Sequence, residues 1–348
     1  MHNLTHRKVL LIGGAGFIGH NLALTLKKYG ADVTIVDSLA VNNLYAIKTN
    51  PNLVPYPELY LQIIDERLRL LKANDIALFE ADSRDYHRLC EIVNQIKPDS
   101  IVHLAAVAHA NRSNKDPHST FDHSLRTLEN ALDIARSDKL NIKHFVYFSS
   151  SMVYGNFEKE AVDEETICNP LGIYGALKFA GEKMVIAYNQ VFNLPYTIIR
   201  PSALYGERCV SRRVGQIFIE NAMNKLDVNI NGKGEDRLDF TYIGDLVEGI
   251  LCTLSNKNAL NQIFNITYGS SRSITEMAEI LKAHFPDLRI NYLPKDSLMP
   301  DRGTLSVEKA KRMIGYNPSH PLEVGFVKYI QWYKKLFDSI QKEKVQHA

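Results

Sequence analysis

Short apolar runs alternate with helical stripes along the first two hundred residues. The runs cover residues 9–12, 33–36, 76–80, 100–104, 144–149 and 196–200. Continuous runs of this length are typical of strands buried on both faces of a parallel sheet. Between them, apolar residues recur every three or four positions, most clearly over 119–136 and 174–192, which predicts helices. Strands that alternate with helices predict an α/β fold with a doubly wound parallel sheet.

Two segments depart from this alternation. Residues 39–75 are punctuated by Asn and Pro and contain one helical stretch near 58–71, so we expect an insertion after the second strand. Beyond residue 201, short strands at 228–230, 240–243 and 290–293 mix with helices at 213–225, 244–254, 273–285, 306–314 and 322–338. We therefore predict a first domain over 1–200, to which residues 236–262 return, and a smaller α/β lobe over 201–340.

Composition excludes several classes of protein. Lys and Arg number 41 and Asp and Glu number 39 in 348 residues, so a net charge of +2 gives no electrostatic case for nucleic acid or an anionic membrane as partner. No apolar run is long enough to span a membrane, and the N-terminus lacks the apolar stretch of a secretory signal. The four cysteines lie far apart without ligand-like spacing, so we expect reduced thiols in the cytoplasm and no metal site.

A glycine-rich loop joins the first strand to the first helix. Gly13, Gly16 and Gly19 have the spacing GxxGxxG, which lets a backbone turn tightly and approach a pyrophosphate at the helix N-terminus. Asp37 closes the second strand 18 residues past Gly19, where a carboxylate holds ribose hydroxyls. That carboxylate would repel a 2′-phosphate, and no Arg or Lys stands beside it. The pattern predicts a Rossmann-type domain that binds NAD in preference to NADP; a glycine turn without a ligand is the alternative.

A second group of residues suggests acid–base chemistry. Tyr174 and Lys178 are four residues apart in a predicted helix and therefore share a face. An ammonium near a phenol stabilises the phenolate, which makes Tyr174 a candidate general base. Serines 149–151 end a predicted strand at the carboxyl edge of the sheet, where open α/β sheets bind ligands. A serine hydroxyl there can hydrogen-bond the same substrate oxygen as Tyr174.

These motifs together resemble those of the extended short-chain dehydrogenases/reductases of the nucleotide-sugar epimerase/dehydratase type. The matching pieces span about residues 8–335 in the family's order and are GGAGFIG at 13–19, Asp37, Asp82-Ser83, HLAA at 103–106, SSSMVYG at 149–155, YGALK at 174–178, RPSALYG at 200–206 and LDFTYIGD at 238–245. The resemblance implies an NAD-binding domain, a substrate-binding lobe for a nucleotide sugar, and a homodimer formed through helices 119–136 and 174–192.

The resemblance also implies roles for particular residues. Tyr174 would be the base, Ser150 would stand at the catalytic Ser or Thr position, and Lys178 would bind the nicotinamide ribose and tune Tyr174. Residues expected at the cofactor are Gly13, Gly16, Phe17, Ile18, Gly19, Asp37, Ser38, Asp82, Ser83, Leu104, Ala105, Ala106, Ser124, Ser149 and Pro201. Residues expected at the substrate are Ser150, Ser151, Met152, His109, Arg213, Arg237 and Arg302.

Departures from the family pattern narrow the reaction. Dehydratases of this type carry Asp-Glu where Ser151 and Met152 stand, and decarboxylating relatives place a Glu at Met152. Neither residue here can act as a carboxylic acid, which favours 4-epimerisation of a UDP-hexose or UDP-hexuronate through a transient 4-keto sugar. The alternatives are a dehydratase of another type, a 4-dehydrogenase or ketoreductase, and a non-catalytic NAD-binding regulator.

Three substitutions affect the expected ligand contacts. Ser124 and Ala203 each stand where many members of the family have Asn, and Leu238 replaces an arginine. Arg213 or Arg237 is expected to compensate for that arginine, alongside Arg302 at the diphosphate.

Overall fold

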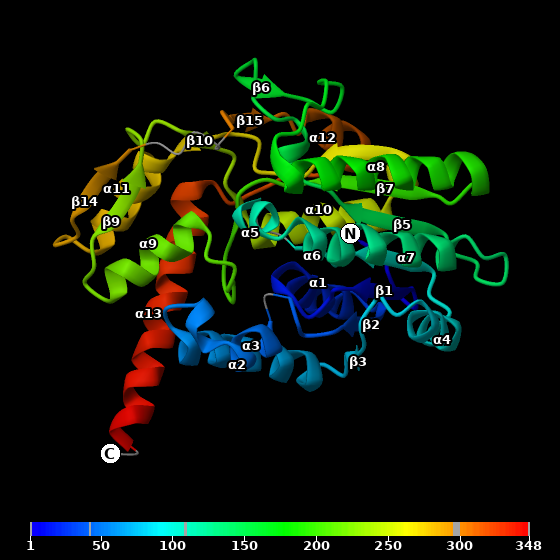
Figure 1. The fold of residues 1–348 in the computed structure, drawn as a ribbon, viewed down its shortest axis with the longest axis horizontal. Coiled ribbons are helices and arrows are strands. Elements are labelled where there is room, and N and C mark those ends of the chain that lie inside the picture. The colour runs from blue at the N-terminus through cyan, green and yellow to red at the C-terminus, as the bar shows by residue number, and fades with distance from the viewer. Residues whose placement is uncertain (1, 42, 108–109, 295–299, 347–348) are drawn as a thin grey trace.

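The computed structural model describes residues 2–41, 43–107, 110–294 and 300–346, and it contains a seven-stranded parallel sheet (Figure 1). The strand order is β12-β7-β5-β4-β1-β2-β3. From β1 the chain adds β2 and β3 on one side and then β4, β5, β7 and β12 on the other, as in a doubly wound fold. The strands are β1 (Lys8–Ile12), β2 (Asp32–Asp37), β3 (Ala77–Glu80), β4 (Ser100–His103), β5 (His144–Phe148), β7 (Tyr196–Arg200) and β12 (Gln262–Asn265). The predicted fold class is confirmed.

Strand β12 is the main element of the sheet that the sequence pattern did not predict. It pairs in parallel with β7, with Phe264 opposite Ile199. Its sequence, QIFN, is short and carries only two apolar residues, because an edge strand is buried less completely than a central one. The chain therefore returns to the sheet at residues 262–265, slightly beyond the segment 236–262 that was expected to return.

Helices cover both faces of the sheet because neighbouring residues of each strand point to opposite sides. Val9 and Leu11 of β1 pack in one apolar cluster with α1 (Phe17–Lys28), α3 (Pro57–Ala73) and α10 (Ile243–Ser255). Leu10 and Ile12 pack in a second cluster with α4 (Tyr86–Ile96), α7 (Thr127–Ala135) and α8 (Gly172–Phe192). The unbroken apolar run at residues 9–12 is thus explained by burial on both faces.

The long helix expected over 119–136 is interrupted. Helix α6 (Pro117–Phe121) continues into a π-helical segment, Asp122–Arg126, before α7 begins at Thr127. A short helix, α5 (Ala110–Lys115), precedes them. A π-helical turn inserts one residue into the helical repeat, so it changes which side chains face the sheet edge.

The insertion at 39–75 is helical and packs on the large sheet's helices. It contains α2 (Leu44–Thr49), a 3₁₀ turn at Pro51–Leu53 and α3, and α3 lies against α1 (Figure 1). Tyr60 of α3 donates a 2.8 Å hydrogen bond to buried Glu220, which also accepts a 3.0 Å bond from Tyr333. These bonds connect the insertion to two helices of the C-terminal region.

After β7 the chain forms α10 and β12 of the sheet region and the further helices α9 (Val214–Met223), α11 (Ile274–His284), α12 (Glu308–Ile314) and α13 (Leu322–Gln346). Short strand pairs lie outside the large sheet, namely β9 (Val228–Asn231) with β14 (Ile290–Leu293), β10 (Arg237–Leu238) with β13 (Arg272–Ser273), β8 (Leu204–Tyr205) with β11 (Thr241–Tyr242), and β6 (Ala161–Val162), which precedes β7, with β15 (Thr304–Leu305). In Figure 1, α9, α11, β9 and β14 lie together at one side of the sheet, whereas α12 and the β6–β15 pair lie near α8. Short 3₁₀ turns occur at Ser151–Val153 and Lys257–Ala259.

Two further observations bear on the expectations from composition. All four cysteines are free thiols. Within the described ranges, no helix is both long enough and apolar enough to cross a membrane.

Candidate active site

The glycine loop between β1 and α1 forms the floor of a cleft at the carboxyl edge of the sheet. Gly13 has a φ of 78°, and a Cβ atom there would lie 2.6 Å from the backbone nitrogen of Ala105, so only glycine fits. Gly16 is different, because the nearest atom to an added Cβ would be 3.6 Å away. The loop is therefore tightly packed beneath Gly13 and open above Gly16, where the first turn of α1 presents free N–H groups.

Asp37 holds this loop in shape. Its carboxylate accepts hydrogen bonds of 2.9 Å from the Ala15 N–H and 2.8 Å from the Leu39 N–H. Burial raises the pKa of Asp37, while these two backbone hydrogen bonds and the charge of Arg67 act in the opposite direction. A carboxylate has about four acceptor positions, so it retains acceptor capacity for a further ligand hydroxyl.

The walls of the cleft contain most of the residues expected at the cofactor. The cleft-lining residues among these are Gly13, Gly16, Phe17, Ile18, Gly19, Asp37, Ser38, Asp82, Ser83, Leu104, Ala105 and Ala106. Arg213, expected only at the substrate, also lines the cleft, as do residues that were not expected there from the sequence, namely Val36, Val41, Arg67, His123, Thr127, Leu204 and Ser211. Most of these residues come from the ends of strands β1, β2, β4 and β8 or from the loops that follow strands, which is where open α/β sheets bind their ligands.

The π-helical segment explains one of the missed residues. His123 and Thr127 line the cleft, whereas Ser124, expected there, is buried and is not among the lining residues. Ser149 and Pro201 are likewise buried away from the cleft surface. The resemblance located the correct helix but could not reveal the extra residue in its repeat.

Ser150 and Tyr174 form the polar pair at the centre of the candidate site. Ser150 caps the 3₁₀ turn at Ser151–Val153, accepting a 3.2 Å hydrogen bond from the Met152 N–H. Tyr174 lies in the first turn of α8 and is half-buried. Burial raises the pKa of the Tyr174 phenol, and the charge of Arg213 and a hydrogen bond with Ser150 lower it. The nearby cation that favours the phenolate is thus Arg213, which the sequence had assigned only to the substrate.

Lys178 is buried and donates a 2.6 Å hydrogen bond to the Phe148 carbonyl. Burial lowers the pKa of Lys178 to about 8, and the nearby charge of Glu182 acts to raise it. The expectation was an ammonium directed at the Tyr174 phenol. Instead, the Lys178 ammonium is held at the end of β5, one helical turn below the tyrosine.

A buried ion pair lies beneath Lys178. Glu182 accepts hydrogen bonds of 2.9 Å and 2.7 Å from the Arg200 guanidinium, and a further short bond from the Ser149 hydroxyl. The side chains of Glu182 and Arg200 are 1% and 3% exposed. Arg200 also donates a 3.0 Å bond to the Tyr154 hydroxyl. The pair joins β7 to α8, which carries Tyr174 and Lys178, and through Ser149 to the segment that follows β5.

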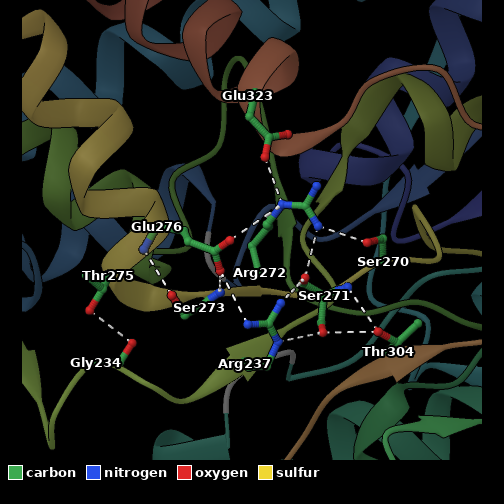
Figure 2. A network of polar contacts seen from close by, with 10 residues as sticks. All are labelled: Gly234, Arg237, Ser270, Ser271, Arg272, Ser273, Thr275, Glu276, Thr304 and Glu323. Carbon is green, nitrogen blue, oxygen red and sulfur yellow. Dashed lines mark hydrogen bonds and ion pairs between the residues drawn. The ribbon is translucent and has the colours of Figure 1, made fainter.

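The three arginines expected at the substrate have different surroundings. Arg213 lines the cleft at the start of α9. Arg302 has an Nε buried without an acceptor among the described residues, and burial together with the charge of Arg213 lowers its pKa to about 10. Figure 2 shows that Arg237 lies in a network in which it donates to Ser271 and faces Glu276 at 3.5 Å. Arg237 is therefore held by the β10–β13 region and is not among the residues lining the cleft.

The remaining expected substrate residues flank Ser150. Ser151 is buried, its N–H donating a 2.9 Å hydrogen bond to the Pro201 carbonyl, and Met152 is half-buried. His109 lies outside the described residues.

Comparisons with known proteins agree with this geometry. Residues 9–267 match the model of the NAD dependent epimerase/dehydratase family. The chain is 31% identical to a Methanocaldococcus jannaschii protein provisionally named UDP-glucose 4-epimerase, over 94% of this chain and 98% of that one. It is 28% identical to UDP-glucuronate 4-epimerase 1 of Arabidopsis thaliana, over 97% and 79% of the two chains. The structure of UDP-glucose 4-epimerase from Thermotoga maritima, with UDP-glucose, superposes with a TM-score of 0.83 at 25% identity, covering 94% of this chain and 99% of that one.

Proposed function

The chain belongs to the NAD dependent epimerase/dehydratase family, and from that premise we propose that it is a nucleotide-sugar epimerase which inverts C4 of a UDP-hexose or UDP-hexuronate. The observation that carries the proposal is the pairing of Ser150 with Tyr174 beside the glycine-loop cleft, with no carboxylic acid at Ser151 or Met152. Relatives named as 4-epimerases cover nearly the whole chain.

NAD is the family's cofactor, and the residues of the cleft fit it. Gly16 leaves room for a phosphate at the first turn of α1, and Asp37 retains acceptor capacity for a ribose diol. Bound NAD supplies a hydride acceptor that can give the hydride back to the same carbon.

Tyr174 is the proposed general base. Its phenolate accepts the proton of the sugar's C4 hydroxyl as the C4 hydride departs, which leaves a 4-keto sugar. Rotation of that sugar presents its other face, the hydride returns there, and Tyr174 gives the proton back to O4. Ser150 hydrogen-bonds the same oxygen and holds it in line with the phenol. Arg213 favours the phenolate by its charge, and Lys178 is proposed to bind the nicotinamide ribose at the end of β5.

The identity of residues 151 and 152 argues against dehydration. Loss of water needs an acid to protonate the leaving hydroxyl and a base to take the neighbouring proton. Ser151 carries a hydroxyl, which is far too weak an acid to replace a carboxylic acid, and Met152 has no ionisable group. The pair supports a reaction in which only the proton and the hydride at C4 move.

Arg213 and Arg302 are the proposed ligands of the substrate diphosphate. The two guanidinium groups are close enough that Arg213 lowers the Arg302 pKa, and the buried Nε of Arg302 has no acceptor among the described residues. Two neighbouring cations repel one another, and a diphosphate between them removes that repulsion.

We also propose that the protein is a homodimer. The stripe expected to form the interface is divided in the structure. Leu125, Leu128 and Leu132 cover the sheet, and only Phe121 of that stripe is exposed. On α8, Val191 and Phe192 are exposed, 68% and 44% respectively, and they leave an apolar surface for a second copy. Gel filtration at micromolar concentration should give twice the 39.4 kDa chain mass, and a 39 kDa species would contradict the proposal.

The test of the reaction is a substrate panel. Purified protein is incubated with UDP-, GDP-, CDP- and dTDP-sugars, and the products are separated and weighed by mass spectrometry. A new retention time at unchanged mass is expected for a UDP-sugar, and it should disappear in Tyr174→Phe. Loss of water would identify a dehydratase, and NADH accumulating stoichiometrically in solution would identify a net oxidoreductase. A Tyr174→Phe variant as active as the wild type would favour a mechanism without this base.

A further inference from the structure

Arg67 is a buried cation from the insertion that reaches the wall of the NAD cleft. It lies on α3, is 1% exposed, and lines the cleft together with Gly16, Asp37 and Ser38. No role was expected for Arg67 from the sequence. Its burial shows that it belongs to the interior.

The hydrogen bonds of Arg67 leave part of the guanidinium unused. Nε donates a 2.8 Å bond to the Arg208 carbonyl, and Nη2 donates to the same oxygen. Nη1 is buried and has no acceptor among the described residues, and no carboxylate among them forms an ion pair with Arg67 within 4 Å. Burial lowers the pKa of Arg67 to about 10, so the group is still charged at neutral pH. The charge of Asp37 partly offsets the burial of this cation, but the buried Nη1 donor still lacks an acceptor, which is costly unless a ligand supplies one.

The position of Arg67 indicates what that ligand is. His20 lies one turn into α1, bonded through Nδ1 to the Gly16 carbonyl at 2.8 Å, and Asp37 ends β2. The charge of Arg67 acts on the pKa values of both residues, so its guanidinium lies near the start of α1 and near the ribose carboxylate. A dinucleotide on this fold places its pyrophosphate at the start of the helix and its adenosine ribose at the carboxylate.

We propose that Arg67 binds the NAD pyrophosphate through its unpaired Nη1 edge. The insertion helix α3 then contributes a residue to the cofactor site. A ribose hydroxyl can also accept a hydrogen bond, but it is neutral. The pyrophosphate is the anionic group of NAD, so it is the group that compensates the buried guanidinium. This inference rests on NAD as the cofactor and does not depend on the sugar substrate.

The test compares two arginines on one helix. Arg67→Gln removes the charge while its amide can still donate to the Arg208 carbonyl, and Arg69→Gln makes the same change at an exposed position of α3. Calorimetric titration of the nucleotide-free full chain with ADP and with adenosine separates the phosphate contribution from the nucleoside contribution. We expect Arg67→Gln to raise the ADP Kd about tenfold or more, with the adenosine Kd unchanged, and Arg69→Gln to change neither.

Other results would overturn the assignment. Equal weakening of ADP and adenosine binding would place Arg67 at the ribose or in the folding of the cleft. An unchanged ADP Kd with a lowered melting temperature would make Arg67 an anchor for the Arg208 carbonyl alone. A larger loss for NADP than for NAD would assign it to a 2′-phosphate.

Arg67→Lys keeps the charge and serves as the second variant if the glutamine variant is too unstable to titrate. It should bind ADP more tightly than Arg67→Gln where both fold, and within about threefold of wild type at low salt. A well-folded lysine variant that binds ADP more than tenfold more weakly than wild type would refute a role for the charge.

Discussion

Replacing Glu182 by glutamine is expected to destabilise the protein strongly. The carboxylate accepts two hydrogen bonds from Arg200, at 2.9 and 2.7 Å, and one from the Ser149 hydroxyl. A glutamine keeps one acceptor oxygen but presents an NH₂ group to donors. It also leaves the Arg200 charge, on a 3% exposed side chain, without a counter-charge. Breaking a buried ion pair from one side costs about 3–5 kcal/mol, a large fraction of the 5–15 kcal/mol that is typical of a domain.

The assay is urea denaturation followed by circular dichroism, and the chain provides a matched control. Arg88 and Glu91 form an exposed ion pair at 2.9 Å, with side chains 51% and 67% exposed. Glu91→Gln should change the free energy of unfolding by less than about 1 kcal/mol. Replacing Glu182 and Arg200 together by methionine should recover much of the loss, because no unpaired charge then remains. If Glu182→Gln is within 1 kcal/mol of wild type, the reasoning about the buried charge is wrong.

The same variant has a second readout at Lys178. The Glu182 charge acts to raise the Lys178 pKa, which burial has lowered to about 8. Without Glu182 that pKa falls further, so Lys178 loses its proton at a lower pH. The alkaline limb of the kcat/KM profile should therefore move to lower pH in Glu182→Gln, while Glu91→Gln leaves the profile in place. If the alkaline limb does not move in a folded Glu182→Gln variant, the titration of Lys178 is not the cause of that limb.

Three further predictions concern single positions. Gly13→Ala should abolish NAD retention measured on the purified protein, because its Cβ would meet the Ala105 backbone, whereas Gly315→Ala, with a similar φ of 71° and nothing within 4 Å, should retain NAD. Asp239 is fully buried with a pKa raised to about 6 by burial, so the folded state favours its protonated form. Stability should fall by about 2 kcal/mol as pH rises from 4 to 6, and urea midpoints of Asp239→Asn should lack that slope. Arg213→Ala should raise the substrate KM about tenfold while Arg237→Ala leaves it unchanged, and the reverse result would assign the diphosphate to the Arg237 network.

The sequence was most informative where a single physical requirement selects the residue. Central strands need continuous apolar runs, and Gly13 needs both a positive φ and close backbone contact, so both could be predicted. Strand β12 was missed because its four residues, QIFN, include only two apolar side chains and so form no apolar run.

The candidate site likewise contains residues that local sequence could predict and residues that it could not. The apolar spacing of 121, 125, 128 and 132 continues through the π-helical segment, so it gives no sign that His123 replaces Ser124 at the cleft. Arg67 has no local signal at all. Its burial depends on α3 packing against α1 and on the Arg208 carbonyl, which is 141 residues away in the chain. Contacts of that kind follow from the tertiary fold and not from any window of sequence.

The pairing of β12 with β7 has a consequence for the order in which the chain can fold during synthesis. Every residue of β7 is buried, yet its outer partner is made more than sixty residues later. Until Gln262–Asn265 leaves the ribosome, the nascent sheet presents β7 as an unpaired, apolar edge, which is a template for intermolecular strand addition. A fragment ending near residue 200 should therefore aggregate, and a nascent chain should need shielding of this edge until the seventh strand emerges.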